Sequence, residues 1–563
     1  MNRLEILADL KQNPEIPVLI VGGGINGIGV FRDLALNGVD ALLVERADFC
    51  SGASAASSHM AHGGIRYLEN GEFRLVREAV AERNRLIRNA PHLVKPLPTT
   101  IPIFEWTSGL LNAPLKFLRL LDRPAERGAA VIKVGLMLYD AYAGGAGVVP
   151  RHRFRGRRAS LSTWSGLNPD IVGTATYYDG AILSPERLAL ELILDAEADN
   201  PRARALNYVS LAGGGGDTAM LRDELAGETF EVRPQLVINA AGPWIDLTNG
   251  KLGLSTRFIG GTKGSHLVLR HPELRGAIGD HEFFFENQDG RIVLIYPLYE
   301  CVLIGTSDIP LEEPDEARCS DDEIEYFLGM VRRVFPHIRL GREHIVFRFS
   351  GVRPLARSPA KTAGQITRDH VIQVMGGQWT GLNFPVHSLV GGKWTSYRAL
   401  AEQAADKALA LLGRARLKDT RSLPIGGGRG YPASPAGQRR SAEGIAAWTG
   451  LPLDRVLELF DRYGTRLEAM ATFLAREPDE PLESLPTYSR REIAFLARHE
   501  KIVHLDDLVL RRSMLAMLGR LSRERLQELA GALGEALDWD GRRVETEQAR
   551  CLDILADRHG VRL

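Results

Sequence analysis

The strongest constraint on the fold of this chain is a glycine-rich turn near the N-terminus, flanked by predicted regular structure. Residues 18–21 are all apolar, which predicts a buried strand, and residues 22–27 follow with the sequence Gly-Gly-Gly-Ile-Asn-Gly. We expect a helix over residues 26–37 and a second strand over residues 41–44, followed by Glu45. This order of strand, glycine turn, helix, strand and acidic residue predicts a Rossmann-like βαβ unit that binds a dinucleotide.

Each residue of this unit has a predicted role in holding the dinucleotide. Gly22 permits the tight turn, Gly24 lets the backbone approach the pyrophosphate, and Gly27 lets the helix pack closely on the strand. Asn26 lies in the first turn of the expected helix, where free N–H groups and the helix dipole favour phosphate. Glu45 is expected to accept hydrogen bonds from the ribose hydroxyls.

A second segment rich in small and hydroxyl side chains favours FAD over NAD as the dinucleotide. Residues 50–58 are small and hydroxyl-rich, and a His-Gly-Gly sequence follows at residues 62–64. Small residues let the backbone lie close to a large planar ligand, and an extended FAD needs such a strip. The alternative is a surface loop that binds nothing. The expected FAD contacts in this segment are Ser57, Ser58, His62, Gly63 and Gly64.

The rest of the chain predicts a second sheet as well as additions to the first. A length of 563 residues is too great for one compact core, so we expect at least two domains. Residues 235–240 form another apolar run and suit a further strand of the first sheet. Residues 283–308 are strand-rich and alternate in polarity, as in an antiparallel sheet.

The C-terminal part has the pattern of a separate helical domain. We divide the chain into a catalytic body over residues 1–415, a glycine- and proline-rich linker over residues 416–430, and a helical domain over residues 431–563. Ser489 followed by Glu492 predicts a capping box at the start of one of its helices.

Composition excludes several classes of protein. Lys plus Arg and Asp plus Glu number 70 each, which argues against a nucleic-acid binder. The four cysteines form no CxxC pair, so we expect no disulfide framework and no metal site, and a reducing cytosol fits. The N-terminus is no secretory signal, and no stretch of about 18 apolar residues predicts a spanning helix.

Motifs along nearly the whole chain resemble the aerobic, FAD-dependent glycerol-3-phosphate dehydrogenases, which are D-amino-acid-oxidase-like flavoproteins. They follow in the order found in that family, so their joint specificity is high. They lie at residues 22–27, 57–58, 62–69, 72–78, 239–244, 263–266, 304–308, 351–355, 366–369 and 391–398, and at Glu492, His499, Glu500, Asp506, Asp507, Arg511 and Arg512.

The resemblance implies both a fold and a reaction. The expected fold is of mixed α/β and α+β class: an FAD-binding α/β domain interleaved with an antiparallel substrate domain, followed by an all-helical C-terminal domain. The expected reaction is oxidation of sn-glycerol 3-phosphate to dihydroxyacetone phosphate by hydride transfer to flavin N5. The electrons would then pass to a membrane quinone.

A phosphorylated polyol needs fixed cations to hold its phosphate, and arginine suits this best because its planar fork gives paired hydrogen bonds. The candidates matched to the family are Arg66, Arg353 and Arg368, with Tyr67 as a neutral donor. Arg353 lies in an apolar context at an expected strand end, where a charge needs a partner that a ligand could supply. We therefore also count Arg353 among the catalytic residues.

Oxidation at carbon 2 needs a base for the hydroxyl proton, and histidine is the usual choice. His266 is the first candidate and His62 its rival, and His266 could instead bind the phosphate. Lys393 is the third catalytic candidate, because it lies in a glycine-rich helix start and can face flavin, substrate or both. Further expected FAD contacts are Gly242, Gly392, Lys393 and Thr395.

A basic, apolar segment at residues 101–139 predicts peripheral attachment to a membrane, with Trp106 as an interfacial anchor. The alternative is a pair of core helices. The expected location is the cytoplasm, on the inner face of the cytoplasmic membrane, where a quinone is accessible. Family likeness also points to a homodimer.

Three departures from the family pattern put the substrate in question. His59 stands where the family usually has Lys, residues 184–187 replace a more usual Asp-Ala-Arg pattern, and Trp394 replaces a smaller side chain. Another polyol phosphate, such as erythritol phosphate, therefore competes with glycerol 3-phosphate. The other hypotheses are a soluble flavin-dependent amine or amino-acid oxidase that uses dioxygen, and a non-catalytic flavin-binding interaction protein.

Overall fold

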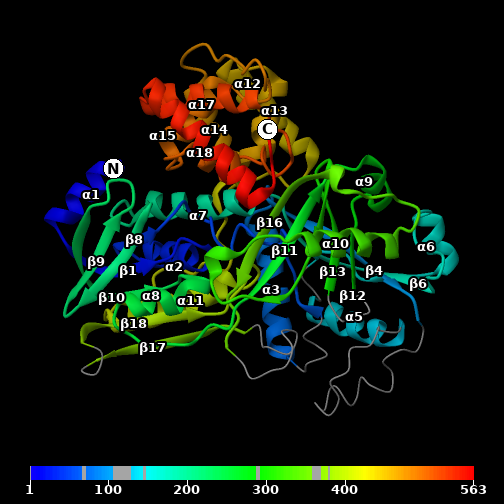
Figure 1. The fold of residues 1–563 in the computed structure, drawn as a ribbon, viewed down its shortest axis with the longest axis horizontal. Coiled ribbons are helices and arrows are strands. Elements are labelled where there is room, and N and C mark those ends of the chain that lie inside the picture. The colour runs from blue at the N-terminus through cyan, green and yellow to red at the C-terminus, as the bar shows by residue number, and fades with distance from the viewer. Residues whose placement is uncertain are drawn as a thin grey trace.

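The computed structural model places two β-sheets side by side beneath a group of C-terminal helices (Figure 1). Chain segments alternate between the two sheets, so that neither sheet is built from one continuous stretch. The structure describes residues 2–65, 72–105, 129–143, 147–286, 292–357, 369–377 and 381–563.

The first sheet is the predicted dinucleotide-binding sheet, in the order β17-β18-β10-β1-β2-β7, with β9 paired to β10 and β8 to β9. The strands expected at residues 18–21 and 41–44 lie in β1 and β2, and the run expected at residues 235–240 ends one residue beyond β10. Strands β2 and β10 each pair in parallel with β1. The strands are β1 (Glu15–Val21), β2 (Ala41–Glu45), β7 (Arg204–Asn207), β8 (Val209–Gly215), β9 (Thr218–Asp223), β10 (Thr229–Asn239), β17 (Val371–Gly377) and β18 (Leu382–Val390).

Helices cover both faces of this sheet at β1, which explains the unbroken apolar run of that strand. Ile20 packs with side chains of α2 (Ile25–Leu36) and α11 (Tyr397–Leu411), whereas Leu19 packs against α1 (Arg3–Gln12) on the other face. Parallel strands covered on both faces need apolar residues at every position rather than at alternate ones.

The second sheet is the expected antiparallel one, with the order β15-β11-β14-β13-β12-β4-β6-β3. Strand β16 also pairs with β11, and β5 with β6. Strands β12, β13 and β14 pair antiparallel, as predicted for residues 283–308. The strands are β3 (Met60–Ala61), β4 (Val94–Ile103), β5 (Arg153–Gly156), β6 (Gly173–Ile182), β11 (Thr262–Leu269), β12 (Glu282–Glu286), β13 (Ile292–Leu298), β14 (Cys301–Gly305), β15 (Ile309–Pro310) and β16 (Ile345–Arg353).

One helix of the body, α5 (Ala129–Ala143), has two apolar faces. Tyr139 and its neighbours on one face are buried beside β6, whereas Val134 on the other face is 60% exposed. Among the described residues no helix is both long enough and apolar enough to cross a membrane. The other helices of the body are α3 (Phe73–Asn89), α6 (Arg157–Thr163), α7 (Pro185–Asp199), α8 (Ile245–Lys251), α9 (Pro272–Ile278) and α10 (Asp321–Val334).

The segment predicted as a linker, residues 416–430, is partly fixed on the body. Its glycine turn η6 (Gly426–Gly428) is buried, and the amides of Gly426 and Gly427 donate to carboxylates of α7, Asp195 and Glu191, both at 3.0 Å. Glycine and proline thus mark a tight buried turn here rather than a loose connection. The sequence pattern alone does not distinguish the two.

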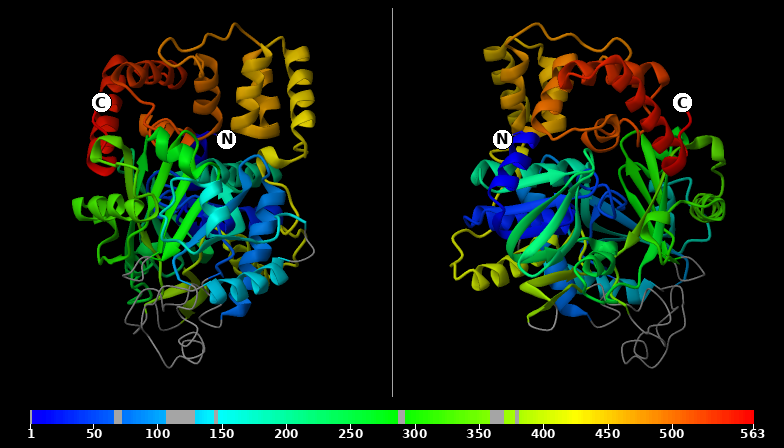
Figure 2. Two further views of the ribbon diagram at one scale, coloured as in Figure 1. Left: turned by 90° about the vertical axis from the view of Figure 1, so that its right-hand side faces the viewer. Right: turned by 60° about the vertical axis from the view of Figure 1, so that its left-hand side comes forward.

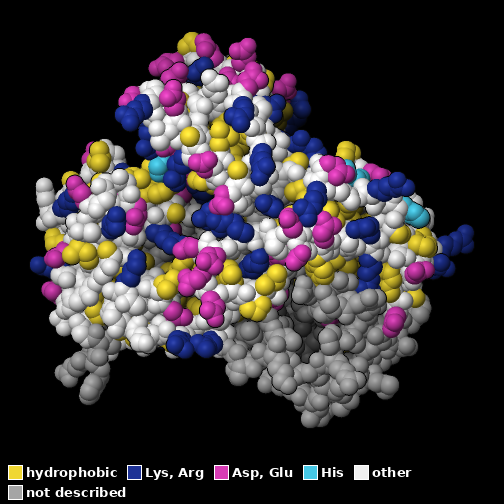
Figure 3. Space-filling view, viewed as in Figure 1, with side chains coloured by type: hydrophobic (Ala, Val, Ile, Leu, Met, Phe, Trp, Pro, Cys, Tyr) yellow, Lys and Arg dark blue, Asp and Glu magenta, His cyan; other side chains and the backbone are white. Residues whose placement is uncertain are grey.

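The C-terminal helices form the expected all-helical domain, here called the cap, which covers one end of the body (Figure 2). Ser489 caps α15 as predicted, but Glu492 binds Tyr463 and two arginines instead of completing the box. On the face in Figure 3, acidic and basic side chains are interspersed. The cap contains α12 (Pro435–Thr449), α13 (Leu453–Tyr463), α14 (Leu467–Leu474), α15 (Arg490–His499), α16 (Leu505–Asp507), η8 (Leu508–Arg512), α17 (Arg523–Leu537) and α18 (Gly541–His559).

Candidate active site

The glycine turn between β1 and α2 has the shape that a dinucleotide requires. Gly22 has φ +113°, and an added Cβ there would lie 2.7 Å from the carbonyl of Ala240. A Cβ at Gly27 would lie only 2.0 Å from the carbonyl oxygen of Gly22. Gly24 is the N-cap of α2 and brings no side chain to cover the N-terminal amides. The turn therefore fits the close approach of a diphosphate.

Glu45 lies at the end of β2 beside this turn, as predicted. Its carboxylate accepts hydrogen bonds from the amides of Gly23 at 2.7 Å and Ala47 at 3.0 Å. Burial raises the pKa of Glu45 above its usual value, and these two amides oppose that effect. The next loop returns to the same turn, since the Cys50 amide donates to the Gly23 carbonyl at 2.9 Å.

The strip rich in hydroxyl groups packs directly against the dinucleotide turn. The Ser54 hydroxyl accepts the amide of Ile25 at 3.0 Å, and the Ser54 carbonyl accepts the indole N–H of Trp394 at 3.0 Å. Nearby, the Ser57 hydroxyl accepts the amide of His59 at 3.3 Å. The hydroxyl-rich composition signals this strip, but nothing in the sequence singles out Ser54.

The loop before α11 packs against the dinucleotide turn and the hydroxyl-rich strip, although it lies far from both in the sequence. Asn26 donates from its side-chain amide to the carbonyl of Gly391 at 3.2 Å, and a Cβ at Gly392 would lie 2.6 Å from that amide nitrogen. The Thr395 hydroxyl accepts the amide of His62 at 3.0 Å. Lys393, whose ammonium nitrogen is buried, belongs to this loop. The structure thus gathers the three expected FAD segments.

Gly63 rests on a buried polar group that sequence reasoning missed. Its amide donates to the Asp179 carboxylate at 2.9 Å and to the Tyr139 hydroxyl at 3.1 Å, and Arg83 donates to the same hydroxyl at 2.9 Å. A Cβ at Gly63 would lie 2.1 Å from the Tyr139 oxygen, which explains the glycine. Gly64 has φ +72°, where glycine is also favoured.

His266 lies on β11 and connects the two domains. Its Nε2 is 2.8 Å from the Ser58 hydroxyl, and its ring stacks on Phe349 with centroids 4.9 Å apart. Burial, together with the nearby Arg353 and His59, lowers the pKa of His266 to about 3. The imidazole is therefore neutral at physiological pH.

Arg353 ends the neighbouring strand β16 and already has a carboxylate partner. It donates to Asp308 at 3.1 Å, to the Thr306 hydroxyl at 2.8 Å and to the Ser307 carbonyl at 2.9 Å. Its guanidinium lies over Gly264, where a Cβ would come within 2.3 Å of it. The expectation that a ligand supplies the partner thus needs correction, because Asp308 supplies one, although the Arg353 side chain stays 23% exposed.

His59, one of the departures from the family pattern, is completely buried beside Ser58 with φ +55°. Burial lowers the pKa of His59 to about 4, and the backbone of Ile182 and Leu183 opposes that effect only in part. A buried neutral imidazole thus occupies a position where the family usually has a long cation.

Several expected residues remain to be placed. Arg66, Tyr67 and Arg368 lie outside the described residues. Gly242 follows β10 with φ +58° and opens the short helix η2 (Gly242–Trp244). Within the described ranges no group of three or more His, Cys, Asp or Glu side chains is arranged to hold a metal ion.

Comparisons with known proteins identify the family of this chain. The FAD dependent oxidoreductase family matches residues 17–398, and the C-terminal domain of alpha-glycerophosphate oxidase matches residues 418–544. A glycerol-3-phosphate dehydrogenase of Synechocystis sp. is 34% identical, with 90% of each chain covered. The enzyme of that name from Pseudomonas aeruginosa is 32% identical, over 89% of this chain and 92% of its own.

The overall fold also matches that of a solved structure. The glycerol-3-phosphate dehydrogenase from Bacillus halodurans, complexed with FAD, superposes with a TM-score of 0.74 and is 21% identical. The match covers 98% of this chain and 97% of that one, so it includes body and cap. The chain has the dinucleotide turn, and the two family matches span most of its length. It therefore belongs to the family of FAD-dependent glycerol-3-phosphate dehydrogenases.

Proposed function

We propose that this protein oxidises sn-glycerol 3-phosphate to dihydroxyacetone phosphate and passes the electrons to a membrane quinone. The observation that carries the proposal is that His266 and Arg353 lie close together on the adjacent strands β11 and β16, where His266 also contacts Ser58. A neutral imidazole and a partly exposed cation thus adjoin the segment that is proposed to face the cofactor. FAD, when bound, supplies N5 as the acceptor of the hydride from carbon 2.

Arg353 is proposed to hold the phosphate. Hydrogen bonds to Asp308, Thr306 and Ser307 fix the plane of the guanidinium, and the Arg353 side chain is 23% exposed. A planar, fixed fork is the geometry that binds phosphate in a bidentate way. Arg66, Tyr67 and Arg368 complete the proposed phosphate site.

His266 is proposed to accept the proton of the carbon-2 hydroxyl. Its Nε2 already contacts a hydroxyl, that of Ser58, and its ring is held by Phe349. Both contacts fix the direction in which the nitrogen points. His62, whose backbone contacts Thr395, is the rival base.

The cofactor is proposed to span the three gathered segments. Lys393 and the start of α11 would place positive charge beside the flavin, where negative charge develops. Glu45 would hold the ribose. The proposed FAD contacts are Gly22, Gly24, Asn26, Gly27, Glu45, Ser57, Ser58, His62, Gly63, Gly64, Gly242, Gly392, Lys393 and Thr395.

We further propose that the protein works in the cytoplasm as a homodimer attached to the inner face of the membrane. The exposed apolar side of α5 supports the attachment, since Val134, Met137 and Leu138 are 60%, 56% and 40% exposed there. Apolar side chains beside a basic segment suit the boundary of a bilayer. The proposed anchor Trp106 lies outside the described residues.

Two other activities stay in competition. His59 and Trp394 depart from the family pattern in segments that are proposed to face FAD or the substrate. Erythritol phosphate therefore stays a second candidate substrate. An amine or amino-acid oxidase would share the FAD site, and Arg353 could bind the carboxylate of an amino acid as well as a phosphate. The reaction product therefore distinguishes the two activities.

The test is a paired assay of FAD-loaded protein on vesicles that contain a quinone. We expect glycerol 3-phosphate to reduce the quinone and form dihydroxyacetone phosphate, with little hydrogen peroxide. Erythritol phosphate should react more slowly, and unphosphorylated glycerol should not react. Peroxide formed with an imino acid from an amino acid would overturn the proposal.

A further inference from the structure

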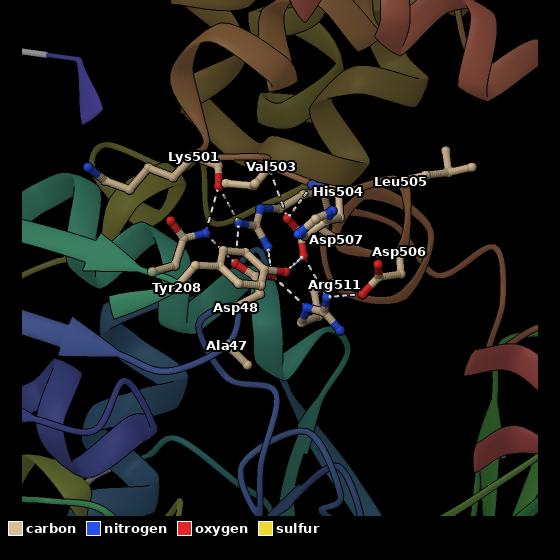
Figure 4. Close-up of polar contacts among 12 residues, drawn as sticks. Ala47, Asp48, Tyr208, Lys501, Val503, His504, Leu505, Asp506, Asp507 and Arg511 are labelled. Atoms are coloured by element: carbon tan, nitrogen blue, oxygen red, sulfur yellow. Dashed lines mark hydrogen bonds and ion pairs between the residues drawn. The ribbon is translucent and has the colours of Figure 1, made fainter. Parts of the chain in front are cut away.

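The loop at residues 46–50 carries a carboxylate that the proposed chemistry does not use. Asp48 is completely buried and accepts hydrogen bonds from two arginines of the cap (Figure 4). Arg511 donates from Nε at 2.5 Å, and Arg512 donates to both carboxylate oxygens, at 2.5 and 2.9 Å. Asn207, on β7, adds a further hydrogen bond at 2.9 Å.

The arginines are themselves held in place by the cap. Arg511 also donates to Asp507 at 2.6 Å and to Asp506 at 2.9 Å, and Arg512 donates to the Glu500 carbonyl at 3.0 Å. Burial alone would raise the pKa of Asp48, but Arg512 and Arg511 outweigh it and hold that pKa well below the usual value. The carboxylate is therefore charged, and the three charged side chains form a rigid unit across the interface between domains.

The same loop contacts the dinucleotide turn on either side of Asp48. Three residues before it, the Glu45 carboxylate accepts the amide of Gly23 at 2.7 Å. Two residues after it, the Cys50 amide donates to the carbonyl of Gly23 at 2.9 Å. Both peptide groups that flank Gly23 are thus tied to a loop whose middle is held by the cap.

We propose that Arg511 and Arg512 act as positioning residues for FAD: by holding Asp48 they fix Glu45 and Gly23, so that cap docking and FAD binding are coupled. This inference rests on the proposal that Glu45 and the turn at residues 22–27 hold FAD. Coupling between two sites is reciprocal, so FAD must also stabilise the docked cap.

A second ion pair at the same interface provides a matched control. Arg187 of α7 binds the Glu500 carboxylate of the cap, and both side chains are 5% exposed. Glu500→Gln removes this charge but leaves the Glu500 carbonyl that Arg512 uses. Asp48→Asn is the same chemical change, made on the loop that contacts Gly23. Only the second change breaks the proposed connection.

The experiment measures the dissociation constant of FAD for the apoprotein of each variant, without any substrate. We expect Asp48→Asn to raise that constant roughly tenfold or more, within the usual range of coupling between sites. Glu500→Gln should change it by less than about twofold. An equal effect of both variants, or no effect of Asp48→Asn, would overturn the proposal.

Hydrogen exchange of the unaltered protein, measured with and without FAD, tests the coupling without any variant. FAD should slow exchange at residues 505–512 of the cap, and unchanged exchange there would refute the coupling.

Gly27→Ala checks the proposed FAD site itself, because a Cβ there collides with Gly22. If Gly27→Ala binds FAD normally, the proposed cofactor site is wrong. If the protein binds FAD but glycerol 3-phosphate does not reduce it, only the proposed reaction fails.

Discussion

Two carboxylate–arginine groups in this molecule have opposite surroundings. At the cap interface, the side chains of Asp48 and Arg512 are 0% and 2% exposed, and each makes hydrogen bonds within the protein. In the substrate domain, Asp308 and Arg353 are 27% and 23% exposed. The first group is closed to any ligand, whereas the second presents a fixed cation to the surroundings.

The difference shows how similar chemistry serves structure in one place and binding in another. Removing one partner from a fully buried pair leaves an uncompensated charge in a medium of low dielectric constant, which strongly destabilises the fold. A partly exposed pair contributes little to stability because water screens it. We therefore expect changes in the closed group to affect stability, and changes in the open group to affect catalysis.

The largest expected effect is on catalysis, at His266 beside the open group. His266→Gln removes the proposed base and should lower kcat/KM for glycerol 3-phosphate roughly 10²- to 10⁴-fold. Because the pKa of His266 is lowered to about 3, the free imidazole is neutral throughout the working range. The ratio of kcat/KM between the unaltered protein and the His266→Gln variant should therefore stay constant from about pH 5 to about pH 9. A ratio that falls toward one below pH 7 would contradict this assignment.

Asp48→Asn should have the next largest effect, and on stability. The loss of one buried charge opposite two arginines is expected to cost about 3–5 kcal/mol of unfolding free energy. Because the folded-state pKa of Asp48 is depressed, its contribution is complete above the unfolded value of about 4 and declines as pH falls through the folded value. Chemical denaturation should therefore show a constant difference from unaltered protein above about pH 5, which shrinks in acid. Equal unfolding free energies of the two proteins at neutral pH would contradict the burial of the Asp48 ion pairs.

Arg353→Ala should have a smaller effect, confined to substrate binding. Loss of charged hydrogen bonds to phosphate, about 1.5–3 kcal/mol for each bond, should raise KM roughly 10- to 100-fold. FAD should remain bound and the melting temperature should hardly change, because the pair is partly exposed. Arg353→Lys keeps the charge but loses the planar fork, so its KM should lie between those of the unaltered protein and Arg353→Ala. Unchanged substrate affinity in Arg353→Ala would refute the assigned role.

The smallest effect is expected on the exposed side of α5. Val134→Glu should weaken binding to vesicles roughly three- to tenfold, because it places a charge where apolar area is proposed to enter the bilayer. Val374→Glu is the matched control, since Val374 is 56% exposed on β17 and Val134 is 60% exposed. If Val134→Glu and Val374→Glu bind vesicles equally well, α5 is not part of the proposed membrane contact.

Sequence patterns predicted the parts of the fold that depend on neighbouring residues. The turn at residues 22–27, its flanking strands and the acid Glu45 are all coded within one short stretch, and the structure has them in place. The cap of α15 at Ser489 is equally local. The local pattern was less informative about Glu492, because its carboxylate is used by arginines from another helix.

Contacts between distant segments left no such signal. Ser58 and His266 are 208 positions apart, and Asp48 and Arg511 are 463 positions apart. Motif resemblance placed Ser58 and His266 in one expected site, but the bond between them follows from the way that β11 meets the strip at residues 51–64. No feature near Asp48 predicted its partners, since an acidic residue in a loop is ordinarily solvated.

We propose above all that Arg353, paired with Asp308, holds a phosphorylated polyol beside the flavin. The most direct measurement is the absorbance of protein-bound FAD during an anaerobic titration with glycerol 3-phosphate. We predict that glycerol 3-phosphate bleaches the flavin and that glycerol at the same concentration leaves it yellow. A flavin that stays oxidised with glycerol 3-phosphate but is bleached by an amino acid would show that the protein is not a polyol-phosphate dehydrogenase.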